Sequence, residues 1–230
     1  MPGFNLEMLL SGRYHEWLVN GLVTTIELSF LAFALALLLG IVITCLRSIP
    51  FRPFKWFAFL YVEYHRNTPA LVQLFFWYFA MPEALPKAVR DWIYQHNGEF
   101  VFAVIALGLC ISAYIAEDIR SGIRSIPTQQ QEAARAIGFS FLQAFFFIVL
   151  PQAIRVSTPA LINRALLTVK NSSLAMAIGV GELIYQGKQV EAMSFRAYEA
   201  FSFITVCYLV LTLSLMALGR WYEHHQQTIK

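Results

Sequence analysis

The sequence predicts an all-α protein that crosses a lipid bilayer about five times. Hydrophobic residues make up 58% of its 230 residues and charged residues only 13%, whereas soluble domains are about 45–50% apolar and about 25% charged. The apolar residues lie in long uninterrupted runs, and one spanning helix needs about 20 of them. Because these runs are apolar on every face, they indicate helices rather than the alternating strands of a membrane barrel.

Three runs are long enough to span a bilayer without any charged residue, namely Leu28–Leu46, Phe100–Ala116 and Ala200–Gly219. Two more segments, residues 54–80 and 145–169, are apolar but contain proline and charged residues. Such groups are tolerated at membrane depth where protein or water satisfies the freed backbone, so we expect both segments to face the protein interior or a pathway. The predicted spans, within one domain of residues 1–230, are 18–46, 54–80, 100–119, 145–169 and 197–219.

Five spans place the two termini on opposite sides of the membrane. Cytoplasmic loops carry an excess of Lys and Arg, and with the N-terminus outside, eight such residues lie on the inner side and five on the outer side. The sequence therefore predicts a periplasmic N-terminus and a cytoplasmic C-terminus. It also places residues 47–56, 120–144 and 220–230 in the cytoplasm.

The cysteine positions and the net charge argue against metal sites, disulfides and nucleic-acid binding. Cys45, Cys110 and Cys207 each stand alone inside an apolar span, whereas metal and redox sites place cysteines or histidines at short fixed spacings. We therefore expect no metal site and no disulfide. The formal net charge of +3 comes without a basic patch interleaved with aromatic residues, which argues against a nucleic-acid partner.

A polar stretch between the third and fourth spans interrupts the apolar pattern. Pro127 followed by Thr128 predicts the start of a helix, and Gly138 offers a left-handed position that ends a short helix. Ala133 and Ala134 are small enough for another surface to approach closely. The helix could instead lie on lipid headgroups, but its polar side is rich in Gln rather than Lys or Arg, which favours a protein contact.

One pattern in this stretch resembles the EAA loop of bacterial ABC-importer permeases. The matching residues, with every spacing kept, are Glu132-Ala133-Ala134, Gly138, Ile148 and Leu150-Pro151. The segments 113–123 and 170–174 resemble the polar-amino-acid branch of these permeases, and residues 61–73 resemble its glutamate/aspartate members. The resemblance covers residues 15–220. Gln129 departs from it, because the family usually has a glycine there.

The resemblance implies most of the partners. It implies a subunit of the bacterial inner membrane that pairs with itself or a sister permease, two cytoplasmic ABC ATPase subunits, and a periplasmic solute-binding protein. ATP and Mg²⁺ would bind to the ATPases, so no cofactor and no enzymatic activity are expected in this chain. Consistently, the sequence has no G-x-x-x-x-G-K-[ST] phosphate loop. The implied ATPase-docking residues of the cytoplasmic coupling helix are Glu132, Ala133, Ala134 and Gly138.

Basic and amide side chains follow the loop at membrane depth. Residues 133–181 contain no Asp or Glu, and charged groups inside a membrane are functional candidates by default. We therefore expect a path that suits an anionic substrate, lined by Arg164, Lys170, Asn171 and Ser172.

Two of the arginines also have a structural interpretation. Arg155 and Arg164 could extend towards a membrane interface, or pair with Glu117 or Asp118 of the third span. An arginine that is neutralised in this way would hold the bundle together rather than meet a substrate.

Further ion pairs are predicted inside the membrane. Glu63 and Arg66 stand three residues apart on one helical face, and unpaired charges there would be costly. Pro69 should kink the same segment. A second cluster shares one face at the inner end of the third span, and it consists of Glu117, Arg120 and Arg124.

These observations predict an ATP-driven importer that moves glutamate or aspartate from periplasm to cytoplasm by alternating access. A permease for glutamine, histidine or arginine is the alternative within the same family. A membrane-embedded enzyme would need convergent catalytic groups or metal ligands, and His65 is the one histidine candidate at membrane depth. An ion channel would need a filter-like loop, which the sequence lacks.

Overall fold

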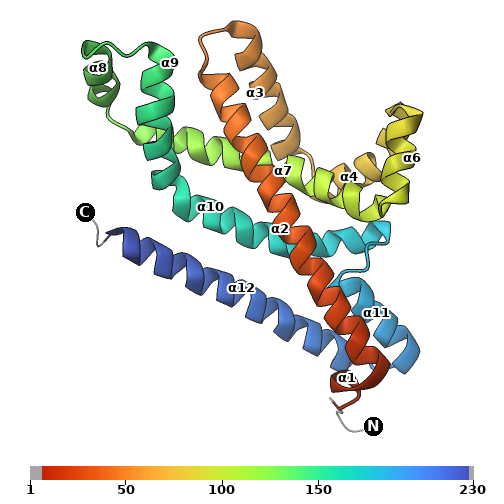
Figure 1. Ribbon diagram of the computed structural model, residues 1–230. Coiled ribbons are helices and arrows are strands. Elements are labelled where there is room, and N and C mark those ends of the chain that lie inside the picture. The colour runs from red at the N-terminus through yellow and green to blue at the C-terminus, as the bar shows by residue number, and fades with distance from the viewer. Residues whose placement is uncertain (1–6, 228–230) are drawn as a thin grey trace.

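The computed structural model describes residues 7–227, and every regular element in that part of the chain is a helix (Figure 1). The all-α prediction is confirmed. The elements are α1 (Glu7–Leu10), α2 (Gly12–Ser48), α3 (Arg52–Asn67), α4 (Ala70–Phe75), the π-helical turn η1 (Phe76–Ala80), α5 (Met81–Ala84), α6 (Lys87–Gln95), α7 (Gly98–Ser125), α8 (Thr128–Ala136), α9 (Phe141–Ala144), the π-helical turn η2 (Phe145–Val149), α10 (Leu150–Ser172), the 3-10 helix η3 (Ser173–Ile178), α11 (Leu183–Ser194) and α12 (Ala197–Gln227).

Four helical segments of residues 7–227 are long and apolar enough to cross a membrane, namely Gly12–Ser48, Gly98–Ser125, Phe141–Ile178 and Ala197–His225. They contain four of the five predicted spans. The remaining segment, residues 54–80, differs from one kinked helix, because α3 ends at Asn67 and α4 begins at Ala70. Pro69 lacks a backbone N–H and disfavours helical geometry in the residue before it. The expected kink is therefore a complete break at Thr68 and Pro69.

Helix α7 lies at the centre of the bundle, with α2, α3, α4 and α10 packed along it (Figure 1). Glycines let α2 and α7 approach closely. A Cβ atom on Gly40 would lie 2.5 Å from Ile115 Cγ2, and one on Gly108 would lie 2.7 Å from Leu35 Cδ2. Apolar side chains such as Ile111 and Ile115 are fully buried beside them. Dispersion contacts between the two helices therefore form the core.

Helix α12 packs on α10 and α11 and keeps a large apolar face exposed. The exposed side chains include Val206, Leu209, Val210, Leu213 and Leu218. A face of this size needs lipid or another subunit to cover it. In Figure 1, α8 and the turn between α2 and α3 lie at the upper left, whereas α1 and α11 lie at the lower right.

The connection between η3 and α11 buries a carboxylate. Glu182 has no exposed surface, and its oxygens accept hydrogen bonds from the backbone N–H groups of Ile184 and Tyr185 at 3.0 and 2.8 Å. The Tyr208 hydroxyl donates a third hydrogen bond, at 3.0 Å. Glu182 therefore caps α11 and ties it to α12. Burial raises the pKa of Glu182 to about 7.

Thermal stability is expected to increase as the pH falls from 8 to 6. A glutamate in an unfolded chain has a pKa of about 4.3, so in this range only the folded state takes up a proton at Glu182, and proton uptake stabilises it. The stability gained in this way is absent above the folded pKa and grows as the pH falls below it. Unfolding of the purified chain in detergent measures the effect.

The Glu182→Gln variant is the control, because its side chain stays neutral at every pH. Its unfolding midpoint should change less between pH 8 and pH 6 than that of the wild type. An equal change in both proteins would contradict the assignment of this pH dependence to Glu182.

Candidate functional site

The short helix expected from Thr128 is α8, which lies between the long helices α7 and α10. Pro127 precedes its first turn, and Gly138 follows it with a φ of +99°, the left-handed geometry that favours glycine. Ser140 then starts α9 with a capping box, in which its hydroxyl accepts from the Gln143 N–H and the Gln143 side chain accepts from the Ser140 N–H. Local sequence signals therefore fix both ends of α8.

The residues of the EAA pattern on α8 do not all face the same way. Ala134 is 2% exposed, on a helix that packs against α9 and η2 of its own chain. Glu132, Ala133 and Gly138 are exposed, and a Cβ atom on Gly138 would meet no atom within 4 Å. The small side chain of Ala134 thus lets α8 pack against α9 and η2 of the same chain. Glu132, Ala133 and Gly138 face outward.

Apolar side chains continue this outward surface. Ile137 is 78% exposed, and Phe139, Phe141 and Leu142 are also exposed. Such a cluster of apolar groups beside a charged Glu132 is typical of a protein contact. We call the surface formed by Glu132, Ala133, Gly138 and these four apolar residues the α8 surface.

A second candidate site lies where α3 and α4 separate. A cavity of about 390 Å³ opens beside the break, and we call it the break cavity. Its lining residues are Arg66, Asn67, Thr68, Pro69, Ala70, Cys110, Tyr114, Leu167 and Asn171. The break thus brings a guanidinium group, a phenol and two amides together among the long helices.

Gln73 holds the break together. It is 1% exposed, and its Nε2 donates to the carbonyl oxygens of His65 and Thr68 at 2.9 and 2.8 Å. Its Oε1 is hydrogen-bonded to His65 Nδ1. Sequence reasoning missed this role, although a lone amide four residues after Pro69 is a signal that freed carbonyls need a donor.

The Gln73→Leu variant is expected to unfold at a markedly lower temperature. The change leaves the buried carbonyl oxygen of His65 and the partly buried one of Thr68 without their donor, and a buried unsatisfied group costs about 1–3 kcal/mol. Thermal unfolding of the purified chain in detergent measures the loss. Gln95→Leu is the matched control, because Gln95 is exposed on α6 and its loss should change little. Equal unfolding midpoints for the two variants would contradict the proposal that Gln73 stabilises the break between α3 and α4.

The predicted ion pair between Glu63 and Arg66 is not formed within the described residues, so this prediction was wrong. Glu63 Oε2 instead accepts a hydrogen bond from Asn67 Nδ2 at 3.0 Å. The Arg66 guanidinium carbon lies 5.7 Å from the centre of the Tyr114 ring. The spacing of three residues permits a pair, but α7 offers Arg66 an aromatic ring, and Asn67 offers Glu63 a nearer donor.

Arg164 pairs with Asp118, which is the structural interpretation considered for it. Its Nε and Nη2 donate to the two Asp118 carboxylate oxygens at 2.7 and 3.1 Å, the strong bidentate geometry. Its guanidinium carbon lies 5.0 Å from the Tyr114 ring centre. Tyr114 therefore contacts two cations, of which only Arg164 has a carboxylate partner within residues 7–227.

The other predicted path residues lie in different surroundings. Asn171 lines the break cavity, and Lys170 before it is exposed. Ser172 is buried, and its hydroxyl donates to the Val169 carbonyl oxygen at 2.8 Å. The structure thus brings one of the four predicted path residues, Asn171, into the cavity.

The ion-pair cluster at the end of α7 differs in one member. Glu117 pairs with Arg120 at 3.1 Å, as predicted, and also with Arg47 at the end of α2. Arg47 was not predicted, because it lies 70 residues away along the chain. The exposed Arg124 has no such pair in the described structure.

Comparison with known protein families decides the identity of the chain. Residues 36–227 match the family described as the binding-protein-dependent transport system inner membrane component. The chain belongs to this family. The resemblance to ABC-importer permeases inferred from the EAA pattern is thereby confirmed. Permeases of this family are membrane subunits and not enzymes, since the ATPase activity lies in a partner subunit.

Individual relatives of this permease are similar over most of their length. The glutamate/aspartate import permease protein GltJ of Escherichia coli (strain K12) is 34% identical over 88% of this chain and 84% of its own. The probable glutamine ABC transporter permease protein GlnM of Bacillus subtilis (strain 168) is 36% identical over 92% and 89%. The crystal structure of an amino acid ABC transporter with histidines contains a chain with a TM-score of 0.82 and 31% identity, covering 98% of this permease and 99% of that chain.

Proposed function

We propose that this permease imports acidic amino acids, glutamate or aspartate, from the periplasm to the cytoplasm. The observation that carries the proposal is the break cavity, in which Arg66 contributes a cation that has no carboxylate partner in the described structure. A substrate carboxylate would supply that partner, and the Asn171 amide could donate a hydrogen bond to it. The resemblance of residues 61–73 to glutamate/aspartate permeases and the similarity to GltJ support the same substrate.

Arg164 and Lys170 have different parts in this proposal. Lys170 is exposed next to Asn171 and would attract the anion towards the cavity. Arg164 is engaged by Asp118, so it would reach a substrate only in a conformation in which that ion pair opens. Ser172 is hydrogen-bonded within its own helix turn and would shape the path rather than touch the substrate.

The partners follow from the α8 surface and the family. We propose that α8 lies in the cytoplasm and seats in one of two ABC ATPase subunits, with Glu132 making a charge-assisted contact worth about 1.5–3 kcal/mol. A second permease subunit would cover the exposed face of α12, and a periplasmic solute-binding protein would deliver the substrate. The N-terminus would then lie in the periplasm and the C-terminus in the cytoplasm. ATP-driven closure of the ATPases would move α8 and switch the access of the cavity.

Glutamine is the second candidate substrate, because GlnM is similar to this permease at a comparable level of identity. The two substrates differ in one charge. Uptake of radiolabelled glutamate by cells that express the complete transporter, competed with aspartate, glutamine, histidine or arginine, distinguishes them. Competition by aspartate alone would support the proposal, and stronger competition by glutamine or arginine would overturn it.

The Arg66→Gln variant is expected to reduce glutamate uptake by about 10–100-fold, since it removes a charge-assisted contact worth about 1.5–3 kcal/mol. Glutamine uptake, if the wild type has any, should fall much less. Arg220→Gln is the matched control, because Arg220 is exposed on α12. Unchanged glutamate uptake in the Arg66 variant would remove Arg66 from the proposed path.

A further inference from the structure

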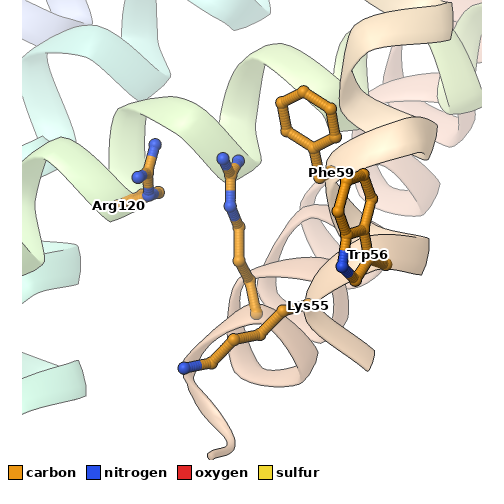
Figure 2. Close-up of a pocket in the computed structure, with 5 residues that line it drawn as sticks. Lys55, Trp56, Phe59 and Arg120 are labelled. Carbon is orange, nitrogen blue, oxygen red and sulfur yellow. The ribbon is translucent and has the colours of Figure 1, made fainter. Parts of the chain in front are cut away.

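A second cavity, of about 460 Å³, lies at the opposite end of α3 from the break. It is formed by the last turn of α2, the first two turns of α3 and the end of α7, and its lining residues are Arg47, Lys55, Trp56, Phe59 and Arg120 (Figure 2). We call it the basic cavity. Figure 2 shows Lys55 and Arg120 on one side of it and the rings of Trp56 and Phe59 on the other.

The basic cavity carries an excess of positive charge. Three of its five lining residues are cationic, and none is acidic. Glu117 pairs with both Arg47 and Arg120, so one carboxylate is shared by two of the three cations. Lys55 is exposed and has no ion-pair partner among residues 7–227. An anion that bound here would complete the charge balance.

The two arginines are already held in position. Glu117 fixes their guanidinium groups, and the Arg47 guanidinium carbon also lies 5.8 Å from the centre of the Phe59 ring. Binding an anion would therefore require little further ordering of these side chains, which reduces the entropic cost of binding. Lys55 is the one cation of the cavity that would have to be ordered.

An exposed apolar face continues from the basic cavity along α3. Trp56 is 63% exposed, Phe57 57% and Leu60 59%. Helix α3 packs against the long apolar helices α2 and α7, so this face runs from the cations along the side of the helix bundle. A phosphate group at the cavity and acyl chains along α3 would match both parts of the site. Inorganic phosphate would match only the cations.

We propose that the basic cavity binds the phosphate headgroup of an anionic phospholipid, with the acyl chains lying along the exposed face of α3. Basic pockets between membrane helices bind anionic headgroups elsewhere, and each Lys or Arg near an anionic membrane surface contributes about 1 kcal/mol. The bound lipid would join the ends of α2, α3 and α7. Because the site lies outside the break cavity and the α8 surface, the proposal does not depend on the transported substrate.

Native mass spectrometry of the full-length permease, purified from membranes with the subunits that accompany it, tests the proposal. Phosphatidylglycerol and phosphatidylcholine with the same acyl chains are added in equal amounts. We expect the wild type to retain phosphatidylglycerol preferentially. The Lys55→Gln variant should retain about fivefold less of it, which corresponds to about 1 kcal/mol, and Lys55→Arg should restore the wild-type amount.

Two controls identify the source of the phosphate and the position of the site. Lys188→Gln removes an exposed lysine from α11 and should leave retention unchanged. Inorganic phosphate in excess should not displace the lipid. Equal retention of the two lipids, unchanged retention in Lys55→Gln, or displacement by inorganic phosphate would each overturn the proposal. Equal unfolding midpoints of the variants establish that all of them are folded.

Discussion

Replacing Ala133 with tryptophan is expected to abolish recruitment of the ATPase while the chain still inserts into the membrane. Ala133 is exposed on α8 next to Glu132, so a large ring there would not disturb the packing of the chain itself. It would, however, hold a partner surface away from the backbone of α8. Co-purification of a co-expressed ABC ATPase with the tagged permease measures the effect, and we expect no detectable ATPase.

Ala192→Trp provides the matched control, because Ala192 is exposed on α11, at the other end of the molecule from α8 (Figure 1). Its ATPase yield should equal that of the wild type. Ala134→Trp should behave differently from both variants, because Ala134 is buried against its own chain and its substitution should lower the amount of folded permease. Wild-type recruitment by Ala133→Trp would show that the docking surface lies elsewhere.

The Asp118→Asn variant is expected to lose about 2 kcal/mol of stability. Removing one member of a fully buried ion pair costs about 3–5 kcal/mol, and the smaller value is expected here because the Asp118 and Arg164 side chains are 16% and 27% exposed. The loss comes from the Arg164 charge, which would remain among the long helices without a carboxylate. Thermal unfolding in detergent measures it.

The double variant Asp118→Asn with Arg164→Gln should recover much of the lost stability, because it removes the stranded charge as well. A double variant that is as unstable as the sum of both single variants would show that the pair contributes little as a pair. Glutamate uptake by the folded double variant would also test whether Arg164 takes part in transport.

The long helices could be predicted because their signal is local. An uncharged run of about 20 apolar residues indicates a membrane-spanning helix, and each of the three such runs lies within one long helix of the structure. The ends of α8 were predictable for the same reason, since Pro127 and Gly138 restrict the backbone at their own positions. Pro69 predicted where the helix is disturbed, but it did not predict that α3 and α4 would be two separate helices.

Apart from the local pair of Glu117 with Arg120, the charge contacts could not be predicted in the same way, because they depend on how the helices pack. Spacing along one helix suggested that Glu63 would pair with Arg66, but Tyr114 of α7 provided a competing contact for the arginine. The choice of Asp118 for Arg164 depends on how α7 and α10 pack. Nothing in the local sequence indicated that Ala134 would be buried while Ala133 stayed exposed.

The way in which α8 is attached has a mechanical consequence. Ile126 and Pro127 connect it to α7, residues 137–140 connect it to α9, and the buried Ala134 fixes it against the chain. Because both connections are short, we expect that α8 moves together with α9 and η2, on which it packs, and that its displacement shifts the start of α10. Helix α10 also contains Asn171, which lines the break cavity. The rigidity of α8 and its connections, rather than its affinity for the proposed ATPase, would then limit how far an ATPase movement displaces the residues of the break cavity.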